Sequence, residues 1–166
     1  MSDTLNDGGS SRTQRFEAHA TRLGVAFQEE IRAIPKYEVA VEHGGQLYIS
    51  GQIPRVDGQV AVTGRVGSHT SLIDAQQSAR ICVVRALAIA RQSLGSLDRI
   101  ARVLRMTVYV QCDADFTLHS EVADAASEIL YEVLAPLGGH TRTSVGVFQL
   151  PKNASTEIDL VLAIAD

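Results

Sequence analysis

The sequence predicts an α+β domain in which two helices pack on one face of a mixed sheet. Three observations predict it. Alternating apolar and polar residues mark several strands, and two long segments repeat apolar residues every three or four positions. The order along the chain is hairpin, helix, strand, helix, strand, strand, so the helices follow separate strands and can cover a common face.

The composition is that of one globular domain with a tail. The chain has 166 residues, of which 45% are apolar, so it can bury a core without disulfides or metal. Only 5% are aromatic and Trp is absent, which leaves aliphatic residues and alanine to build that core. The net charge is −4 and no long basic run occurs, so neither nucleic acid nor an anionic membrane is an expected partner.

Cysteine usage and the amino terminus predict a cytoplasmic protein. Cys82 and Cys112 are isolated, which predicts reduced thiols. The first twelve residues are polar and resemble no secretory signal, and no apolar run is long enough to span a bilayer.

The amino-terminal third begins with a polar, glycine- and serine-rich segment, so residues 1–12 are predicted to be a disordered tail. Residues 13–34 form a predicted helical extension. Apolar residues among charged ones indicate a short amphipathic helix at 13–23 and another helical turn near 26–32, which Pro35 ends. The main domain is then expected to span residues 35–166.

A hairpin opens the main domain. Residues 37–42 and 46–50 alternate in polarity around Gly44 and Gly45, which is typical of two strands joined by a glycine turn. The glycine-rich segment 51–69 is predicted to be a loop, with a short strand near 59–62.

The clearest helix is predicted over residues 70–94. Thr70 or Ser71 can cap its start and Gly95 can end it in the left-handed conformation. Its apolar stripe has 3.6-residue spacing and contains Leu72, Ala75, Ala79, Cys82, Val83, Ala86, Leu87, Ala90 and Leu94.

A strand at 99–111, a second helix at 113–134 and two final strands at 142–148 and 156–165 complete the pattern. Two helices leave the second sheet face open. That face is expected to carry Tyr48, Thr107, Tyr109, Val161, Ala163 and Gly146 or their neighbours. Since this set is too apolar for a fully wet surface, the sequence predicts an oligomer in which another copy of the chain covers it.

Standard catalytic motifs are absent. The sequence contains no glycine-rich phosphate loop, no HExxH and no GxSxG. The five histidines show no ligand spacing, so neither a metal nor a cofactor is expected, and His140 is interpreted as a solvated loop residue. Cys82 is predicted to be core, and nothing near Cys112 in the sequence argues for a lowered thiol pKa.

Three segments in order carry a family resemblance. Tyr37 precedes a hairpin that ends in SGQIP (Ser50–Pro54), the segment Arg142–Pro151 reads RTSVGVFQLP, and Glu157 follows on a strand. With this order and spacing, residues 35–166 resemble the Rid/YjgF family.

The resemblance implies a chorismate-mutase-like fold, a homotrimer and clefts between its subunits. It implies that Arg142 binds a substrate carboxylate, that Glu157 handles the proton or the attacking water, and that Tyr37, Ser50 and Gly51 shape the cleft. The implied activity is that of a hydrolase, an imine deaminase that converts 2-aminoacrylate and similar enamines or imines to 2-keto acids and ammonium.

The chain departs from the family pattern at three positions. Ser144 stands where many members have cysteine, and Gly146 replaces a common acidic residue. The cleft asparagine of many members cannot be aligned securely, and Ser120 is one candidate for its place. The extension at 13–33 could also pack beside the cleft mouth and change substrate choice.

The residues themselves fit this chemistry. An arginine fork makes two charge-assisted bonds to a carboxylate, and a protonated imine needs only orientation, a proton source and a placed water. Arg142, Ser144 and Gly146 fall on one strand face. If 142–148 and 156–164 pair antiparallel, Arg142 and Glu157 lie on the order of 18 Å apart and meet only across a subunit boundary.

Two functions remain open from the sequence. The first is hydrolytic deamination of small carboxylate-bearing enamines or imines at clefts between subunits. The second is a non-catalytic module of the same fold that binds a small carboxylate metabolite or a partner protein, which the departures at Ser144 and Gly146 favour. Ribonuclease activity, an older label of the family, is disfavoured by the acidic balance.

Overall fold

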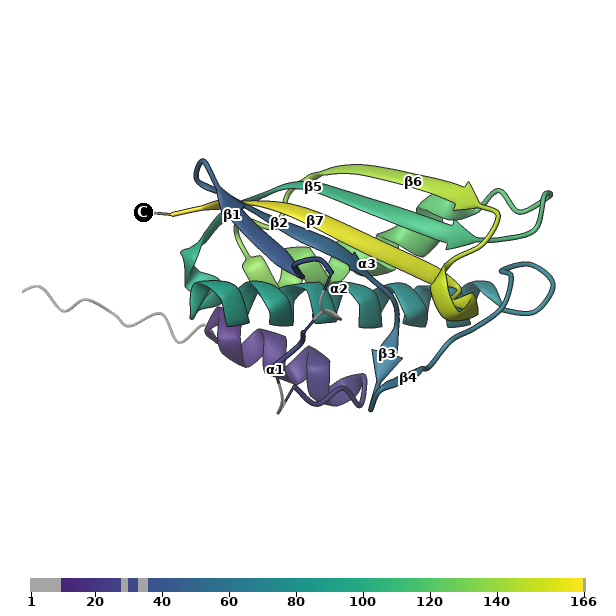
Figure 1. Ribbon diagram of the computed structural model, residues 1–166, viewed down its shortest axis with the longest axis horizontal. Helices are drawn as coiled ribbons and strands as arrows, with labels where there is room; N and C mark the ends of the chain where they lie inside the picture. Colours follow the sequence, from purple (N-terminus) through teal and green to yellow (C-terminus); the bar gives the residue numbers. More distant parts are fainter. Residues whose placement is uncertain (1–9, 28–29, 33–35, 166) are drawn as a thin grey trace, which may run out of the picture.

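The computed structural model of the 166-residue chain describes residues 10–27, 30–32 and 36–165. A five-stranded sheet lies over a layer of helices (Figure 1). Its strand order is β1-β2-β7-β5-β6, made of β1 (Ala40–His43), β2 (Gln46–Gln52), β7 (Thr156–Ile164), β5 (Ile100–Gln111) and β6 (Thr141–Val147). All neighbours pair antiparallel except β5 and β6, which are parallel, so the mixed sheet is confirmed.

The remaining elements lie at the ends of the sheet or beneath it. Helices α2 (Leu72–Leu94) and α3 (His119–Leu134) cover one face, and α1 (Arg12–Arg22) lies on their outer side (Figure 1). A two-stranded hairpin of β3 (Arg55–Val56) and β4 (Gln59–Val60) and two 3₁₀ turns, at Leu97–Arg99 and Pro151–Asn153, complete the described chain. No helix within the described residues is long and apolar enough to cross a bilayer.

Helix α2 follows its predicted caps. The Ser71 hydroxyl accepts the backbone N–H of Asp74, and Gly95 ends the helix at a φ of 79°. Its apolar stripe is buried except for the half-buried Leu72, and Cys82 is confirmed as a core residue whose burial raises its thiol pKa to about 12. Helix α3 begins at His119 rather than 113, because the Asp113 N–H bonds the Val66 carbonyl and the following residues turn before the helix starts.

The two faces of the sheet differ as predicted. Val108 and Val110 of β5 face the helices and are fully buried, as are Ile158 and Leu160 of β7. The opposite face lacks a covering element among the described residues. It carries Tyr48, Thr107, Tyr109, Val145, Val161 and Ala163.

Gly146 does not belong to that open face. It pairs with Val110, whose side chain is buried under the helices, so the prediction that placed Gly146 on the open face is wrong. The reason is register, since a shift of one residue moves a side chain to the other face of a strand. Arg142 and Ser144 share the helix face with it, as predicted.

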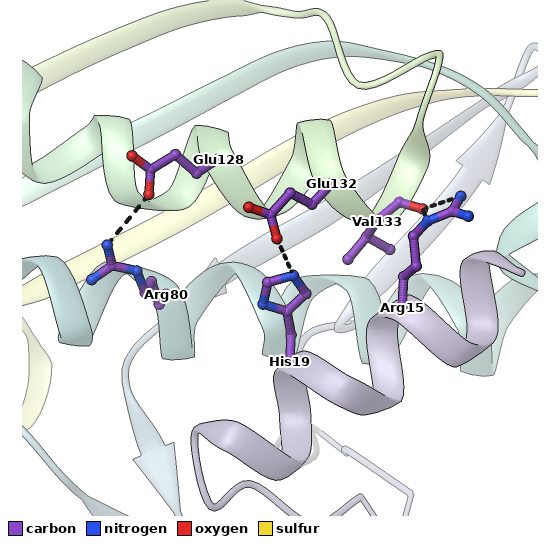
Figure 2. Close-up of polar contacts among 6 residues, drawn as sticks. All are labelled: Arg15, His19, Arg80, Glu128, Glu132 and Val133. Carbon is purple, nitrogen blue, oxygen red and sulfur yellow. Dashed lines mark hydrogen bonds and ion pairs between the residues drawn. The ribbon is translucent and has the colours of Figure 1, made fainter. Parts of the chain in front are cut away.

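The helical part of the amino-terminal extension packs against α2 and α3, whereas Glu30, Ile31 and Arg32 line a surface groove with the candidate residue Tyr37. Figure 2 shows Arg15 donating from Nε to the Val133 carbonyl at 3.1 Å and His19 Nε2 lying 2.8 Å from the Glu132 carboxylate, both on α3. Positions 26–27 and 30–32 are not helical, so the predicted turn near 26–32 is wrong for those residues, and 28–29 lie outside the described residues. The predicted tail at 1–12 is described only from residue 10, and Ser11 already caps α1.

Replacing Phe16 by alanine is expected to destabilise the protein by about 3–5 kcal/mol. Phe16 is 1% exposed, its ring centroid lies 5.8 Å from that of Phe27, and the Arg91 guanidinium lies 4.7 Å above it. The measurement is the midpoint of urea unfolding. Exposed Arg22→Ala on the same helix is the control, and equal midpoints for both variants would show that α1 is not part of the cooperative fold.

Candidate functional site

The candidate residues fall into two clusters at different strands. The arginine cluster is Arg142 with Asp124, Ser127 and His140 at the β6 edge of the sheet. The glutamate cluster is Glu157 with Gly51, Ser50 and Asp159 on β2 and β7. Strand β5 lies between β6 and β7, so the two clusters are separated within one subunit.

Arg142 is anchored by one of its three nitrogens. Its Nη1 donates to the Asp124 Oδ1 at 2.7 Å and to the Ser127 Oγ at 3.0 Å, both on α3. The arginine side chain is 24% exposed, whereas that of Asp124 is 58% exposed. These bonds hold the guanidinium in one orientation against the helix.

A hydrogen-bonded histidine supports this anchor. The His140 Nδ1 lies 2.8 Å from the Gly138 carbonyl, which can only accept, so we assign the ring proton to Nδ1. His140 Nε2 then accepts from the Ser127 hydroxyl at 3.0 Å, and the Ser127 oxygen remains free to accept from Arg142. The interpretation of His140 as a solvated loop residue is therefore wrong, because the ring links the β6 entry to α3.

The opposite edge of the guanidinium is the part of Arg142 that can bind a ligand. Among the residues that the structure describes, Arg142 Nε and Nη2 have no hydrogen-bond partner. An arginine can present two parallel N–H donors to a carboxylate, in a geometry that lysine does not reproduce. Arg142 thus offers a two-donor site for a carboxylate while its other nitrogen is held by the protein.

Ser144 and Ser120 make no hydrogen bond to Arg142 in the described chain, and the hydrogen bonds of Arg142 go to Asp124 and Ser127. Ser144 is half-buried and follows Arg142 by two residues on the same strand face, so it lies on the helix side of β6. Ser120 lies exposed in the first turn of α3.

The glutamate cluster depends on a glycine. Glu157 pairs with Tyr109, on the open face, and a Cβ at Gly51 would lie 1.9 Å from the Glu157 Oε1. The register of β2 against β7 shifts between Ile49 and Gln52, which brings the Gly51 backbone against the carboxylate. Ser50 is held beside it, since the Gln52 amide donates to its carbonyl at 3.0 Å. The structure thus brings Ser50, Gly51 and Glu157 together.

Burial raises the pKa of the Glu157 carboxyl, and the neighbouring negative charge of Asp159 raises it further. Both effects disfavour the ionised form. Asp159 follows Glu157 by two residues on the same strand face and also accepts the Tyr109 hydroxyl at 3.2 Å. A carboxyl with a raised pKa is suited to exchange protons near neutral pH.

Tyr37 lies apart from both clusters. Its side chain is 62% exposed and lines a surface groove of about 440 Å³ with Arg32, Val39 and Gln92. The structure therefore does not bring Tyr37 to Glu157 or Arg142 within one subunit.

The separation of Arg142 from Glu157 has a different cause from the one expected. The two final strands do not pair with each other, so the distance derived for an antiparallel pair of these strands does not apply. On β5, Arg142 is opposite Met106 and Glu157 is opposite Tyr109, three residues further on. Because the offset is odd, the two side chains lie on opposite faces of the sheet. Three residues along the strand separate the two positions by roughly 10 Å, and two strand spacings across the sheet separate them by roughly another 10 Å.

Metal-binding side chains do not gather in the described part of the chain. No group of three or more His, Cys, Asp or Glu residues there can hold a metal ion. Its two clusters instead provide a two-donor cation on one face and a carboxyl with a raised pKa on the other.

Gly51→Ala is expected to move the Glu157 carboxylate while the fold is kept, because the clash is with the flexible end of a side chain. For a reaction that uses Glu157, we expect kcat to fall by about 10²-fold, since small displacements of a reacting group have effects of that size. Gly44→Ala, at a turn with φ of 59° and no neighbouring heavy atom, is the control for general glycine effects. Comparable turnover in both variants would contradict the assigned contact.

Comparison with known proteins adds a family match. Residues 17–164 match the family described as "YjgF/chorismate_mutase-like, putative endoribonuclease". Protein TCP17 of Trypanosoma cruzi is 34% identical over 151 residues, which cover 90% of this chain and 94% of that protein.

Solved structures agree with the fold. Protein Atu1372 of Agrobacterium tumefaciens has a TM-score of 0.83 at 35% identity, over 93% of this chain and 95% of its own. The YjgF gene product of Escherichia coli has a TM-score of 0.61 at 24% identity, over 86% of this chain and 98% of its own. The second similarity concerns the fold alone.

Proposed function

This chain belongs to the YjgF/chorismate mutase-like family, and we propose that it hydrolyses small carboxylate-bearing enamines and imines of the 2-aminoacrylate type. The products are a 2-keto acid and ammonium. One observation carries the proposal. Arg142 is fixed through Nη1 by Asp124 and Ser127, while its Nε and Nη2 donors have no partner in the described chain.

The proposed active site forms between subunits. Arg142 and Glu157 face opposite sides of one sheet, so one small substrate contacts both only if they come from different copies of the chain. A closed ring repeats the same contact at each interface, and a homotrimer is the proposed assembly. The open sheet face with exposed Tyr48 and Val145 supports such an assembly, because apolar side chains there gain from burial.

The proposed mechanism needs no cofactor and no metal. Arg142 binds the substrate carboxylate, and Ser144 lies next to it on the same face. The enamine takes a proton at carbon and becomes the imine, and a water molecule adds to the imine carbon. Glu157 transfers the protons of these steps, and the resulting carbinolamine releases ammonia to leave the keto group. Water supplies the oxygen, so atoms balance without a further reactant.

A second candidate is binding without catalysis. Ser144 and Gly146 stand where many relatives have a cysteine and an acidic residue, so the chain can retain the arginine site for a small carboxylate metabolite without turnover. Nucleic acid is not a proposed ligand, because the net charge is −4 and Arg142 is already neutralised in part by Asp124. A membrane is not a proposed partner either.

A coupled assay tests the proposal. A pyridoxal-phosphate dehydratase generates 2-aminoacrylate from serine, and release of pyruvate is followed with and without this protein. We expect release to accelerate in proportion to protein concentration, and we expect light scattering to give the mass of a trimer. Specific binding of pyruvate without acceleration would support the non-catalytic module instead, and a monomer with full activity would overturn the shared site.

A further inference from the structure

A cavity of about 560 Å³ lies at the end of β6, beyond the arginine cluster. It is called the thiol–imidazole cavity below. Its lining residues come from the loop before α2, the β5–α3 connection and the end of β6, and include Arg65, Cys112, Phe116, His119, Gly146 and Phe148. None of them belongs to the proposed reaction.

A thiol and an imidazole meet at its base. Cys112 Sγ lies 3.4 Å from His119 Nε2, and the His119 ring meets the Phe116 ring edge-on with centroids 5.3 Å apart. Burial raises the pKa of the Cys112 thiol, and the charge of Asp113 adds to this. The thiol is therefore a neutral, polarisable wall group that shares a hydrogen bond with the imidazole.

Gly146 keeps this cavity open. A Cβ at this position would lie 2.7 Å from His119 Nε2 and 2.9 Å from Cys112 Sγ, closer than side-chain carbons approach their neighbours. Any larger residue would fill the cavity or push the thiol–imidazole pair aside. The glycine in the middle of a strand motif therefore creates space where a side chain would otherwise stand.

The outer wall of the cavity is partly aromatic. Phe148 is 84% exposed, and the Arg65 guanidinium lies 4.8 Å from the centroid of its ring. Arg65 also donates to the Cys112 carbonyl at 3.1 Å and to the Phe148 carbonyl, which fixes the guanidinium plane. Aromatic rings, a thiol and a held guanidinium are surfaces that a planar apolar group contacts favourably.

The cavity continues the strand face of the proposed site. Arg142, Ser144 and Gly146 follow one another on the helix side of β6, and four residues of strand span on the order of 14 Å. On α3, Asp124, which accepts from the Arg142 guanidinium, is five residues from His119 at the cavity, which corresponds to roughly 8 Å along the helix. A substrate whose carboxylate binds Arg142 reaches the cavity only with a side chain longer than a methyl group.

We propose that the thiol–imidazole cavity receives the side chain of the substrate and that the preferred substrates are 2-imino acids with a planar aromatic side chain. This proposal rests on the proposed function, because it takes the carboxylate to bind at Arg142. It assigns Gly146 the role of a specificity-determining residue. The aliphatic and acidic 2-imino acids are the competing classes.

Binding of the product keto acids tests the specificity without requiring turnover. Titration calorimetry on the full chain compares phenylpyruvate, pyruvate and 2-oxoglutarate with wild type, Gly146→Val and Cys112→Ser. We expect wild type to bind phenylpyruvate at least about tenfold more tightly than the other two, from burial of one ring. Gly146→Val is expected to bring the ratio near one while pyruvate affinity is kept. Cys112→Ser leaves the cavity open but replaces the polarisable sulfur by a hydroxyl, so it is expected to lower the ratio only in part.

Four results would overturn the assignment. The first is no preference for phenylpyruvate in wild type, and the second is a preference that survives Gly146→Val in a protein with an unchanged circular dichroism spectrum. The third is tighter binding of 2-oxoglutarate than of phenylpyruvate, which would assign the cavity to acidic side chains. Failure of every keto acid to bind would remove the carboxylate site itself and the cavity proposal with it, whereas normal pyruvate binding without preference would remove only the cavity proposal.

Discussion

Arg142→Ala is expected to lower kcat/KM for 2-aminoacrylate by about 10²–10⁴-fold. The variant loses two charge-assisted hydrogen bonds to the carboxylate, each with an energy of about 1.5–3 kcal/mol. The coupled assay measures the ratio to wild type. We expect KM to rise and kcat to fall, because an unanchored substrate loses both affinity and its alignment with Glu157.

A loss of folded protein is not expected to account for the lower kcat/KM of Arg142→Ala. Removing the guanidinium leaves Asp124 without its ion-pair partner, but the side chain of Asp124 is 58% exposed and is solvated by water. Arg142→Lys is the matched control, since it keeps the charge but not the two-donor geometry, and it is expected to recover less than about a tenth of the lost activity. Activity of Arg142→Ala close to wild type would remove the arginine from the reaction and leave the proposed function without its main support.

Periodicity predicted most of the fold because most elements bury one continuous face. Helix α2 and the last two strands of the chain, β6 and β7, follow apolar spacing. Their predicted and observed bounds agree within a few residues. The start of α3 was predicted too early because the segment after Asp113 is stabilised by a contact with Val66, far away in the sequence. Such a contact leaves no local pattern.

The alternation of apolar and polar residues did not predict which strands pair. Alternation shows which residues of a strand share a face, but not which strand lies beside it. The distance expected between Arg142 and Glu157 was conditional on an antiparallel pair of the last two strands. The structure inserts β5 between them, and the parallel pairing of β5 with β6 requires the crossover that α3 provides.

The sequence predicted the charged residues of the candidate site but not the residues that hold the arginine in place. Arg142 and Glu157 stand in motifs, whereas Asp124, Ser127 and His140 are ordinary helix and loop residues until the fold brings them to the arginine. For Asp124 and Ser127 the sign in the sequence is their three-residue spacing, which places both on one side of α3.

The thiol–imidazole pair was missed for a similar reason. Cys112 and His119 are seven residues apart, on either side of a turn whose shape the sequence does not define. Gly146 was the available signal, because a glycine inside a strand often marks the close approach of another group.

Glu157→Gln is expected to reduce kcat by about 10²–10⁴-fold with little change in KM. Glutamine has the size and hydrogen-bonding reach of the glutamate and fits against Gly51, but it does not exchange the proton that the reaction requires. The coupled assay at saturating substrate measures kcat. Glu132→Gln, a carboxylate on the outer side of α3 that pairs with His19, is the control with an unchanged rate.

The pH profile provides a second test of Glu157. As a proton acceptor it must be ionised, so the rate should rise with pH through a pKa that is raised above the ordinary value of a glutamate. Asp159→Asn removes a charge that raises this pKa, so the rising limb is expected to move to lower pH. An unmoved limb in Asp159→Asn would assign the titration to another group.

The pH dependence of stability tests the pKa of the Glu157 carboxyl without requiring turnover. A raised pKa in the folded state means that the fold holds the proton more tightly than the unfolded chain does. The stabilisation is complete below the unfolded pKa and is lost as pH rises through the folded pKa. Because Glu157→Gln cannot ionise, its Tm should exceed that of wild type by a margin that grows from pH 4 to pH 8. A constant margin would show that the carboxyl titrates normally, and an assignment of Glu157 as the proton-transfer group would then need another source for its reactivity.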